Sequence, residues 1–548
     1  MSSNLFKVKP LKEIIAASEE GIQLKRSLSA FNLIVLGIGV IVGAGLFSIT
    51  GIAAGQYAGP AVTVSFIIAA VGCAFAGLCY AEFASMIPVA GSAYTYSYAT
   101  LGEFVAWIIG WDLVLEYAVG AATVSISWSQ YLLKFLGNYG IHFPIELVMS
   151  PFETSTLADG TVIHGIFNLP AAFIVLVLSI ILIKGIKESA FFTTIIVILK
   201  LTVVFAFIVL GWKYMNPANH HPYFIENTGT WGSFGISGIM RAAGIMFFAY
   251  IGFDAISTAA QETKNPQKDM PIGILGSLII CTILYVLFSH VMTGLANYTE
   301  FQGQQETLAP VAVAISHTPY SWLEQGVIIA ILAGYMSVIL VLLLGQSRVF
   351  FSMSKDGLLP KVFSSVHPKF QTPYKSSILF AIFVALLASI APAKVVGEMT
   401  SIGTLFAFIL VCIGILVMRK KMPDAPRAFR TPLVPFVPIM GVLVCLMMMA
   451  SLGLDTWVRL IFWLVLGLDL YYFYGVKNSN LNTKKVFVYD KLLSWSTIVA
   501  SLLLIIIALI HHRVSPHDKV LMLVSLILGV AHLLFHFYKL VVESRKSA

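Results

Sequence analysis

Fourteen apolar segments, each long enough to cross a lipid bilayer, follow one another along the chain. A hydrocarbon core of about 30 Å requires about 20 apolar residues in a helix. The segments span residues 31–55, 61–86, 101–131, 170–186, 189–212, 234–259, 272–296, 324–353, 377–392, 398–418, 433–451, 456–475, 491–511 and 519–541. They predict an all-α polytopic membrane protein and exclude a porin-like barrel, whose strands alternate apolar and polar residues.

Composition agrees with this class, because 58% of the 548 residues are hydrophobic and only 11% are charged. The five cysteines lie in or beside apolar segments and show no metal-ligand spacing, so we predict packing roles, no disulfide and no metal. No phosphate-binding loop, zinc-protease motif or nucleophile elbow is present, and we predict neither an enzyme nor a cofactor.

The distribution of Lys and Arg predicts the orientation, because these residues are retained on the cytoplasmic side of membrane helices. With the N-terminus inside, the outer loops contain few cations, namely Lys134, Lys213, Lys394, Arg513 and Lys519. All the other segments rich in cations fall inside, so we predict cytoplasmic N- and C-termini in the cell membrane. The net charge of +8 then reflects topology, and no nucleic-acid partner is predicted.

Two of the predicted helices carry glycine and small residues at mid-membrane depth. The first contains "GVIVGAGLF" and the sixth contains "FFAYIGFDAIS". Unwound backbone is tolerated in a bilayer only where it lines a cavity, and matching breaks in two halves of a chain point to a transporter's binding site. Close helix packing is the alternative explanation for either glycine-rich stretch alone.

Six stretches occur in order that resemble a known superfamily: "LKRSLSAFNLIVLGIGVIVGAGLF", "YAEFASMIPVAGSAYTYSYATLGEF", "GWDLVLEYAVGAATV", "MFFAYIGFDAISTAAQETKNPQKDMPIGI", "GQSRVFFSMSKDGLLP" and "APRAFRTPLVPFVPIMGVL". They resemble the amino acid, polyamine and organocation transporters, with the closest likeness to the cationic amino acid transporter family. The resemblance runs from about residue 20 to about residue 475 and carries little of the loop at 137–169 or the last two helices.

The resemblance implies a leucine-transporter-type fold of two five-helix inverted repeats in which helices 1 and 6 are broken. The implied division is a cytoplasmic segment 1–30, a first repeat 31–212, a second repeat 234–418, additional helices 433–541 and a cytoplasmic tail 542–548. Free N–H groups at a half-helix N-terminus suit a carboxylate, and unwound carbonyls suit an ammonium.

The resemblance also implies the substrate-binding residues. The carboxylate would lie against the N–H groups around Ala44, Gly45 and Leu46, with Gly43, Ala44 and Gly45 small so that substrate reaches the backbone. The ammonium would face the carbonyls of Ile41, Phe248 and Ile251, and Ala249 lies in the same break as Phe248. Phe248 and Tyr250 would cover the site with their aromatic rings. The substrate side chain would be bounded by Glu116, Gly120 and Ile339.

Two ionisable residues lie deep in predicted helices. Lys200 is far from either end of its helix, and in proton-coupled relatives a lysine replaces the sodium site, so Lys200 is the predicted proton carrier. A lysine that ties helices together is the alternative. Glu116 either meets a cationic side chain, takes part in proton transfer, or is a protonated residue bonded to another helix.

We therefore predict a secondary active amino acid transporter that takes up cationic or small neutral L-amino acids with protons by alternating access. An exchanger, or a sensor of the same fold that binds without transport, is the alternative. The predicted partners are an amino acid, protons and the lipid bilayer. An accessory membrane subunit is left open.

Overall fold

The computed structural model describes residues 4–11, 13–14, 28–43, 45–89, 91–156, 161–184, 189–302, 310–370, 372–482, 491–514 and 519–547. Within these residues ten helices are long and apolar enough to cross a membrane, and four shorter apolar helices accompany them. Each of the fourteen predicted segments overlaps one of these helices. The protein is thus a polytopic all-α membrane protein, as predicted.

The first predicted helix is divided. α2 (Ala30–Ile41) begins at Ser29, whose hydroxyl caps the backbone N–H of Asn32 while the Asn32 side chain returns to the Ser29 N–H. The helix ends before Gly43, and the chain continues as a π-helical turn η2 (Gly45–Ile49), α3 (Thr50–Ala53) and η3 (Ala54–Ala58). Gly59, with φ of 60°, turns the chain through η4 (Gly59–Ala61) into α4 (Val62–Met86).

The sixth predicted helix is divided in the same way. α10 (Gly235–Met246) tightens into the 3₁₀ turn η8 (Phe247–Tyr250), and a second 3₁₀ segment η9 (Asp254–Glu262) follows. Gly252 between them adopts φ of 110°, and a Cβ there would lie 2.3 Å from a methyl of Val40. Only glycine satisfies both the backbone angle and the close approach of the two broken helices.

The other elements surround these two helices. They are η1 (Asn4–Phe6), α5 (Ser92–Thr100), α6 (Glu103–Val114), η5 (Leu115–Val119), α7 (Gly120–Gly137), η6 (Ile145–Leu147), β1 (Thr154–Thr156), β2 (Val162–His164), α8 (Leu169–Lys184), α9 (Ser189–Trp212), η7 (Pro217–His220), α11 (Pro266–Leu295), η10 (Tyr298–Gln302), α13 (Pro310–Ser316), α14 (Ser321–Lys355), α15 (Tyr374–Ile390), α16 (Ala393–Lys421), α17 (Phe436–Ser451), α18 (Leu454–Leu470), η11 (Tyr471–Gly475), α19 (Val476–Asn478), α20 (Lys491–Val514) and α21 (Lys519–Ser547).

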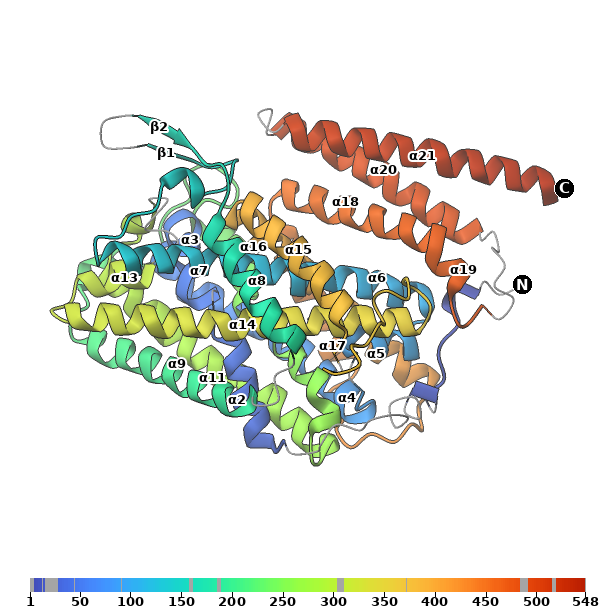
Figure 1. The fold of residues 1–548 in the computed structure, drawn as a ribbon, viewed down its shortest axis with the longest axis horizontal. Coiled ribbons are helices and arrows are strands. Elements are labelled where there is room, and N and C mark those ends of the chain that lie inside the picture. The colour runs from blue at the N-terminus through green and yellow to red at the C-terminus, as the bar shows by residue number, and fades with distance from the viewer. Residues whose placement is uncertain are drawn as a thin grey trace.

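The long helices run roughly parallel to one another, with α14 through the middle and α8 and α15 crossing it obliquely (Figure 1). The antiparallel hairpin β1–β2 lies at one end of the bundle, and the end of α21 lies at the other. Lys9 forms an ion pair of 2.8 Å with Asp356 just after α14, which places the N-terminal segment beside the end of that helix. Both chain ends therefore lie on one side, away from the hairpin.

Large apolar side chains cover the outer surface of the bundle, among them Leu534 at 64% exposure on α21 and Phe205 at 64% on α9. Exposed apolar surface on this scale is unfavourable in water and expected against lipid tails. Polar side chains instead gather inside, where Ser, Thr and Tyr hydroxyls bond to helix carbonyls.

Candidate functional site

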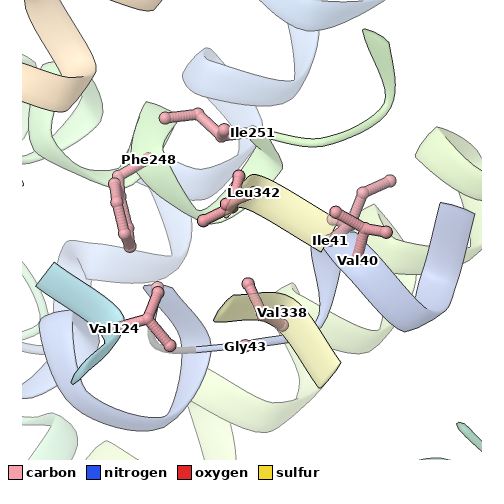
Figure 2. Close-up of a pocket in the computed structure, with 9 residues that line it drawn as sticks. Val40, Ile41, Gly43, Val124, Phe248, Ile251, Val338 and Leu342 are labelled. Carbon is pink, nitrogen blue, oxygen red and sulfur yellow. The ribbon is translucent and has the colours of Figure 1, made fainter. Parts of the chain in front are cut away.

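A small cavity lies where the two broken helices meet. Its lining consists of Val40, Ile41, Gly43, Gly45, Val124, Phe248, Ile251, Val338 and Leu342. Figure 2 shows Val124 from α7 and Val338 from α14 beside the break at Gly43, with Phe248, Ile251 and Leu342 on the opposite side of the cavity. About 20 Å³ is open to the centre of a water molecule, which is room for about one water. In this conformation the cavity is therefore too small to hold an amino acid.

The two broken helices touch directly. A Cβ on Gly45 would lie 2.3 Å from Cα of Ala249. The backbone of Ala249 therefore packs against Gly45 and leaves no space for a side chain there, which is a reason for glycine that the sequence did not indicate. The predicted reason, room for substrate, stays a prediction. A Cβ on Gly43 would meet only the Val338 side chain, at 3.1 Å, so Gly43 is less tightly packed than Gly45, although both glycines line the cavity.

Some of the backbone N–H groups at the first break already form hydrogen bonds within the chain. The N–H groups of Leu46 and Phe47 both donate to the Gly43 carbonyl at 3.1 Å. The first N–H groups of a helical segment lack partners within it, which leaves Gly45 at the start of η2 as a donor beside the cavity. Ala44 lies outside the described residues.

Tyr285 on α11 joins the two breaks. Its hydroxyl lies 2.7 Å from the Ile41 carbonyl oxygen, one of the three predicted to face a substrate ammonium, and 2.8 Å from the carbonyl oxygen of Ala249. The resemblance did not indicate this residue. A signal was present, because a tyrosine in the middle of an apolar span requires a partner for its hydroxyl.

Lys200 reaches the same break from α9. Its side-chain nitrogen donates to the carbonyl oxygens of Gly39 at 2.7 Å and Val42 at 2.9 Å. These carbonyls belong to the C-terminal turn of α2 and lack partners within the helix, and the negative end of the helix dipole favours a cation there. Gly334 on α14 provides the space, since a Cβ there would lie 2.5 Å from Cε of Lys200.

The predicted side-chain pocket differs from the observed lining. Glu116, Gly120 and Ile339 are buried but do not line the cavity, whereas Val124, one turn after Gly120, and Val338 and Leu342, which flank Ile339, do. Tyr250 also turns away and donates its hydroxyl to the Phe66 carbonyl at 3.2 Å, so it does not cover the cavity as predicted. Leu46 and Ala249 are buried within the contact of the breaks.

Glu116 lies in the π-helical turn η5 within the third predicted span. Its carboxyl group is beside that of Asp254, which accepts the Tyr117 hydroxyl at 2.5 Å. Both carboxyl groups are fully buried. Among the described residues neither Glu116 carboxylate oxygen has a hydrogen-bond partner. The predicted roles of Glu116, in meeting a cationic side chain, in proton transfer or in bonding to another helix, stay predictions.

Two broken helices that meet at a small cavity within a bundle of apolar helices are the arrangement expected at the binding site of a membrane transporter. The amino acid permease family matches residues 28–470. The branched-chain amino acid permease BcaP of Bacillus subtilis is 45% identical over 482 residues, which cover 88% of this chain and 100% of the relative.

Two other relatives are somewhat less similar. The methylthioribose transporter of Bacillus subtilis is 41% identical over 88% of this chain and 100% of its own length. The vacuolar cationic amino acid transporter 4 of Arabidopsis thaliana is 37% identical over 73% of this chain and 64% of the relative. The chain belongs to the amino acid permease family, and the predicted superfamily is confirmed.

Proposed function

We propose that this protein takes up amino acids with branched apolar side chains together with protons, by alternating access. The observation that carries the proposal is the lining of the cavity, which among the described residues consists of seven apolar side chains and two glycines. Burying an aliphatic side chain against such a surface gains about 25 cal/mol per Å², and the side chains of the lining offer no partner to the charged group of an arginine or lysine side chain.

Recognition of the amino acid backbone would fall to the breaks. The N–H group of Gly45 at the start of η2 suits a carboxylate, and the carbonyls of Ile41 and Ala249, now bonded by Tyr285, suit an ammonium. An incoming ammonium would compete with the Tyr285 hydroxyl for these oxygens. The roles of Gly43, Gly45, Phe248 and Ile251 in substrate binding are part of this proposal.

Proton coupling would act through Lys200, because its nitrogen holds the segment that the substrate would also use. A protonated Lys200 stabilises the carbonyls of Gly39 and Val42. Substrate bound at Gly43 and Gly45 would act on the same few residues. If the proton on Lys200 and the substrate both shift the conformation of this segment, each must change the affinity for the other by the same factor. Coupled transport requires such an interaction.

A thermal-shift screen tests the substrate class. Purified protein would be screened for thermal stabilisation by leucine, isoleucine, valine, alanine, arginine and methylthioribose, since a ligand that binds the native state raises Tm. We expect the branched aliphatic amino acids to stabilise it at the lowest concentrations. Stabilisation by arginine, with none by leucine, would contradict the proposal and favour the cationic alternative. Stabilisation by methylthioribose alone would favour a thioether sugar as substrate.

Transport also has to be distinguished from sensing. Counterflow of labelled leucine into liposomes requires both sides of the site to open, whereas a sensor would bind leucine without exchange across the membrane. Exchange that occurs only against internal amino acid and ignores a pH gradient would support an antiporter instead.

A further inference from the structure

The last two helices lie beyond the part of the chain that matches the family, residues 28–470. α20 packs on α18 through Val458, Val465, Leu504 and Ala508, and α21 packs on α20 at the edge of the bundle (Figure 1). The outward faces of both helices are apolar and exposed. A polar cluster lies beneath this surface.

The cluster consists of Asp469 on α18 and His532 and His536 on α21. The spacing of four residues places both imidazoles on one face of α21, one helical turn apart. Nε2 of His532 contacts Oδ1 of Asp469, and Nε2 of His536 lies 3.3 Å from the same oxygen. One donor atom from each residue lies within 4.8 Å of the other two. The imidazoles are 3% and 0% exposed and the carboxylate 25%.

A third helix orients the first imidazole. Nδ1 of His532 lies 2.6 Å from the Ser501 hydroxyl on α20, which is also 2.8 Å from the Thr497 carbonyl. A hydroxyl has one proton, and a helical serine commonly donates it to the carbonyl four residues earlier. Ser501 then accepts from Nδ1–H of His532. In the neutral ring the lone pair is therefore on Nε2, aimed at the Asp469 carboxylate.

A lone pair and a carboxylate oxygen in contact repel each other unless a proton or a metal ion lies between them, and two imidazoles that converge on one carboxylate oxygen suit a metal ion. We propose that Asp469, His532 and His536 form a binding site for a zinc-class divalent metal ion that fastens α21 to α18. Two imidazoles and a carboxylate are ligands that suit Zn²⁺, with a hydrogen-bonded second nitrogen on the ligating histidine.

The dimensions are compatible with a tetrahedral site. Metal–ligand bonds of about 2.0–2.1 Å place neighbouring ligand atoms roughly 3.3 Å apart. The Asp469–His536 pair has this separation, at 3.3 Å, and His532 would move outward to admit the ion. The partly exposed Asp469 leaves access for water as a fourth ligand. Such an ion would link α18 and α21 directly and reach α20 through Ser501.

Metal analysis of the full-length protein tests the proposal. The protein would be purified in detergent through a tag without histidine, stripped with EDTA, exposed to ZnCl₂ or to MgCl₂, and desalted. We expect close to one zinc ion per chain by elemental analysis and no retained magnesium. Failure of the wild-type protein to retain zinc would overturn the proposal and leave the cluster as an ion pair.

Variants locate the ion. Asp469→Asn and His536→Gln keep the side-chain size and should each reduce retained zinc at least tenfold. His511→Ala, which removes a buried histidine of α20 outside the cluster, should retain it. Equal zinc in all three variants would place the metal elsewhere and overturn the assignment.

Two further readouts do not depend on how the variants fold. Zinc should raise the Tm of the stripped wild-type protein by several degrees, because a metal that binds only the native state stabilises it. Co²⁺ bound in place of zinc should give the intense visible absorption of a tetrahedral nitrogen and oxygen site. A weak octahedral spectrum, or a Tm that ignores zinc, would contradict the proposed site.

Discussion

The side-chain nitrogen of Lys200 donates to the carbonyl oxygen of Val42 at 2.9 Å, at the residue where the first membrane helix ends. This contact connects a deeply buried lysine on α9 to the backbone that borders the cavity. Adding or removing a proton on Lys200 would therefore alter the C-terminal turn of α2 without any direct contact with substrate. The predictions below depend on this relationship and on the cavity beside it.

Gly334→Ala should uncouple transport from the pH gradient although Lys200 itself is unchanged. The added methyl would lie 2.5 Å from Cε of Lys200 and would displace the flexible side chain from the Gly39 and Val42 carbonyls. We expect accumulation driven by a pH gradient to fall at least tenfold, with substrate binding reduced less. Gly326→Ala on the same helix is the control, since no atom lies within 4 Å of its added methyl. Similar uptake by both variants would mean that the position of Lys200 does not matter.

Gly43→Ala should weaken substrate binding about tenfold, or ~1.4 kcal/mol, because its methyl enters the space beside Val338. Gly120→Ala is the matched comparison. Gly120 does not line the cavity, and its methyl would meet Thr400 at 3.3 Å and the side chain of Leu342, a lining residue, at 3.5 Å, an ordinary van der Waals contact, so we expect near wild-type affinity. Titration calorimetry with leucine compares the two. The reverse order of affinities would locate the pocket at Gly120, where the family resemblance placed it.

Tyr285→Phe should destabilise this conformation of the site. The substitution leaves the Ile41 and Ala249 carbonyls without their hydroxyl partner, which costs about 1 kcal/mol within a membrane bundle. Removal of this competitor should also alter the affinity for the substrate ammonium. Thermal unfolding with and without leucine measures both effects. An unchanged Tm together with unchanged affinity would show that Tyr285 is not part of the site.

The sequence was sufficient to predict the membrane class, the helices and both breaks, because apolar length and mid-span glycines are local signals. Lys200 could be singled out as a deeply placed residue for the same reason, since a charged side chain in the middle of an apolar segment is a local signal. The cavity lining could not be predicted, because it depends on how α7 and α14 are rotated about their axes. Val338 lines the cavity and its neighbour Ile339 does not, so a rotation of α14 by one residue would exchange them. The π-helical turn at Glu116 changes the rotation of the third span in the same way.

Glu116→Gln should reduce transport of all substrates to a similar extent. Glu116 lies beside Asp254 and away from the cavity lining, so neutralising it perturbs the carboxyl pair and not the contact with a particular side chain. Asp254→Asn should have a similar effect, because it removes the acceptor of the Tyr117 hydroxyl. Competition between leucine and arginine provides the measurement. A loss confined to arginine would instead assign Glu116 to recognition of a cationic substrate.

The central claim is that protonation of Lys200 drives uptake through the broken first helix. The most direct test is accumulation of labelled leucine in liposomes under an imposed pH gradient, with and without sodium, by the wild-type protein and by Lys200→Met, which retains an apolar side chain of similar length. We predict that the wild type accumulates leucine in proportion to the pH gradient and independently of sodium, whereas Lys200→Met binds leucine but does not concentrate it. Accumulation by Lys200→Met, or a wild type that requires sodium and ignores the pH gradient, would contradict the account.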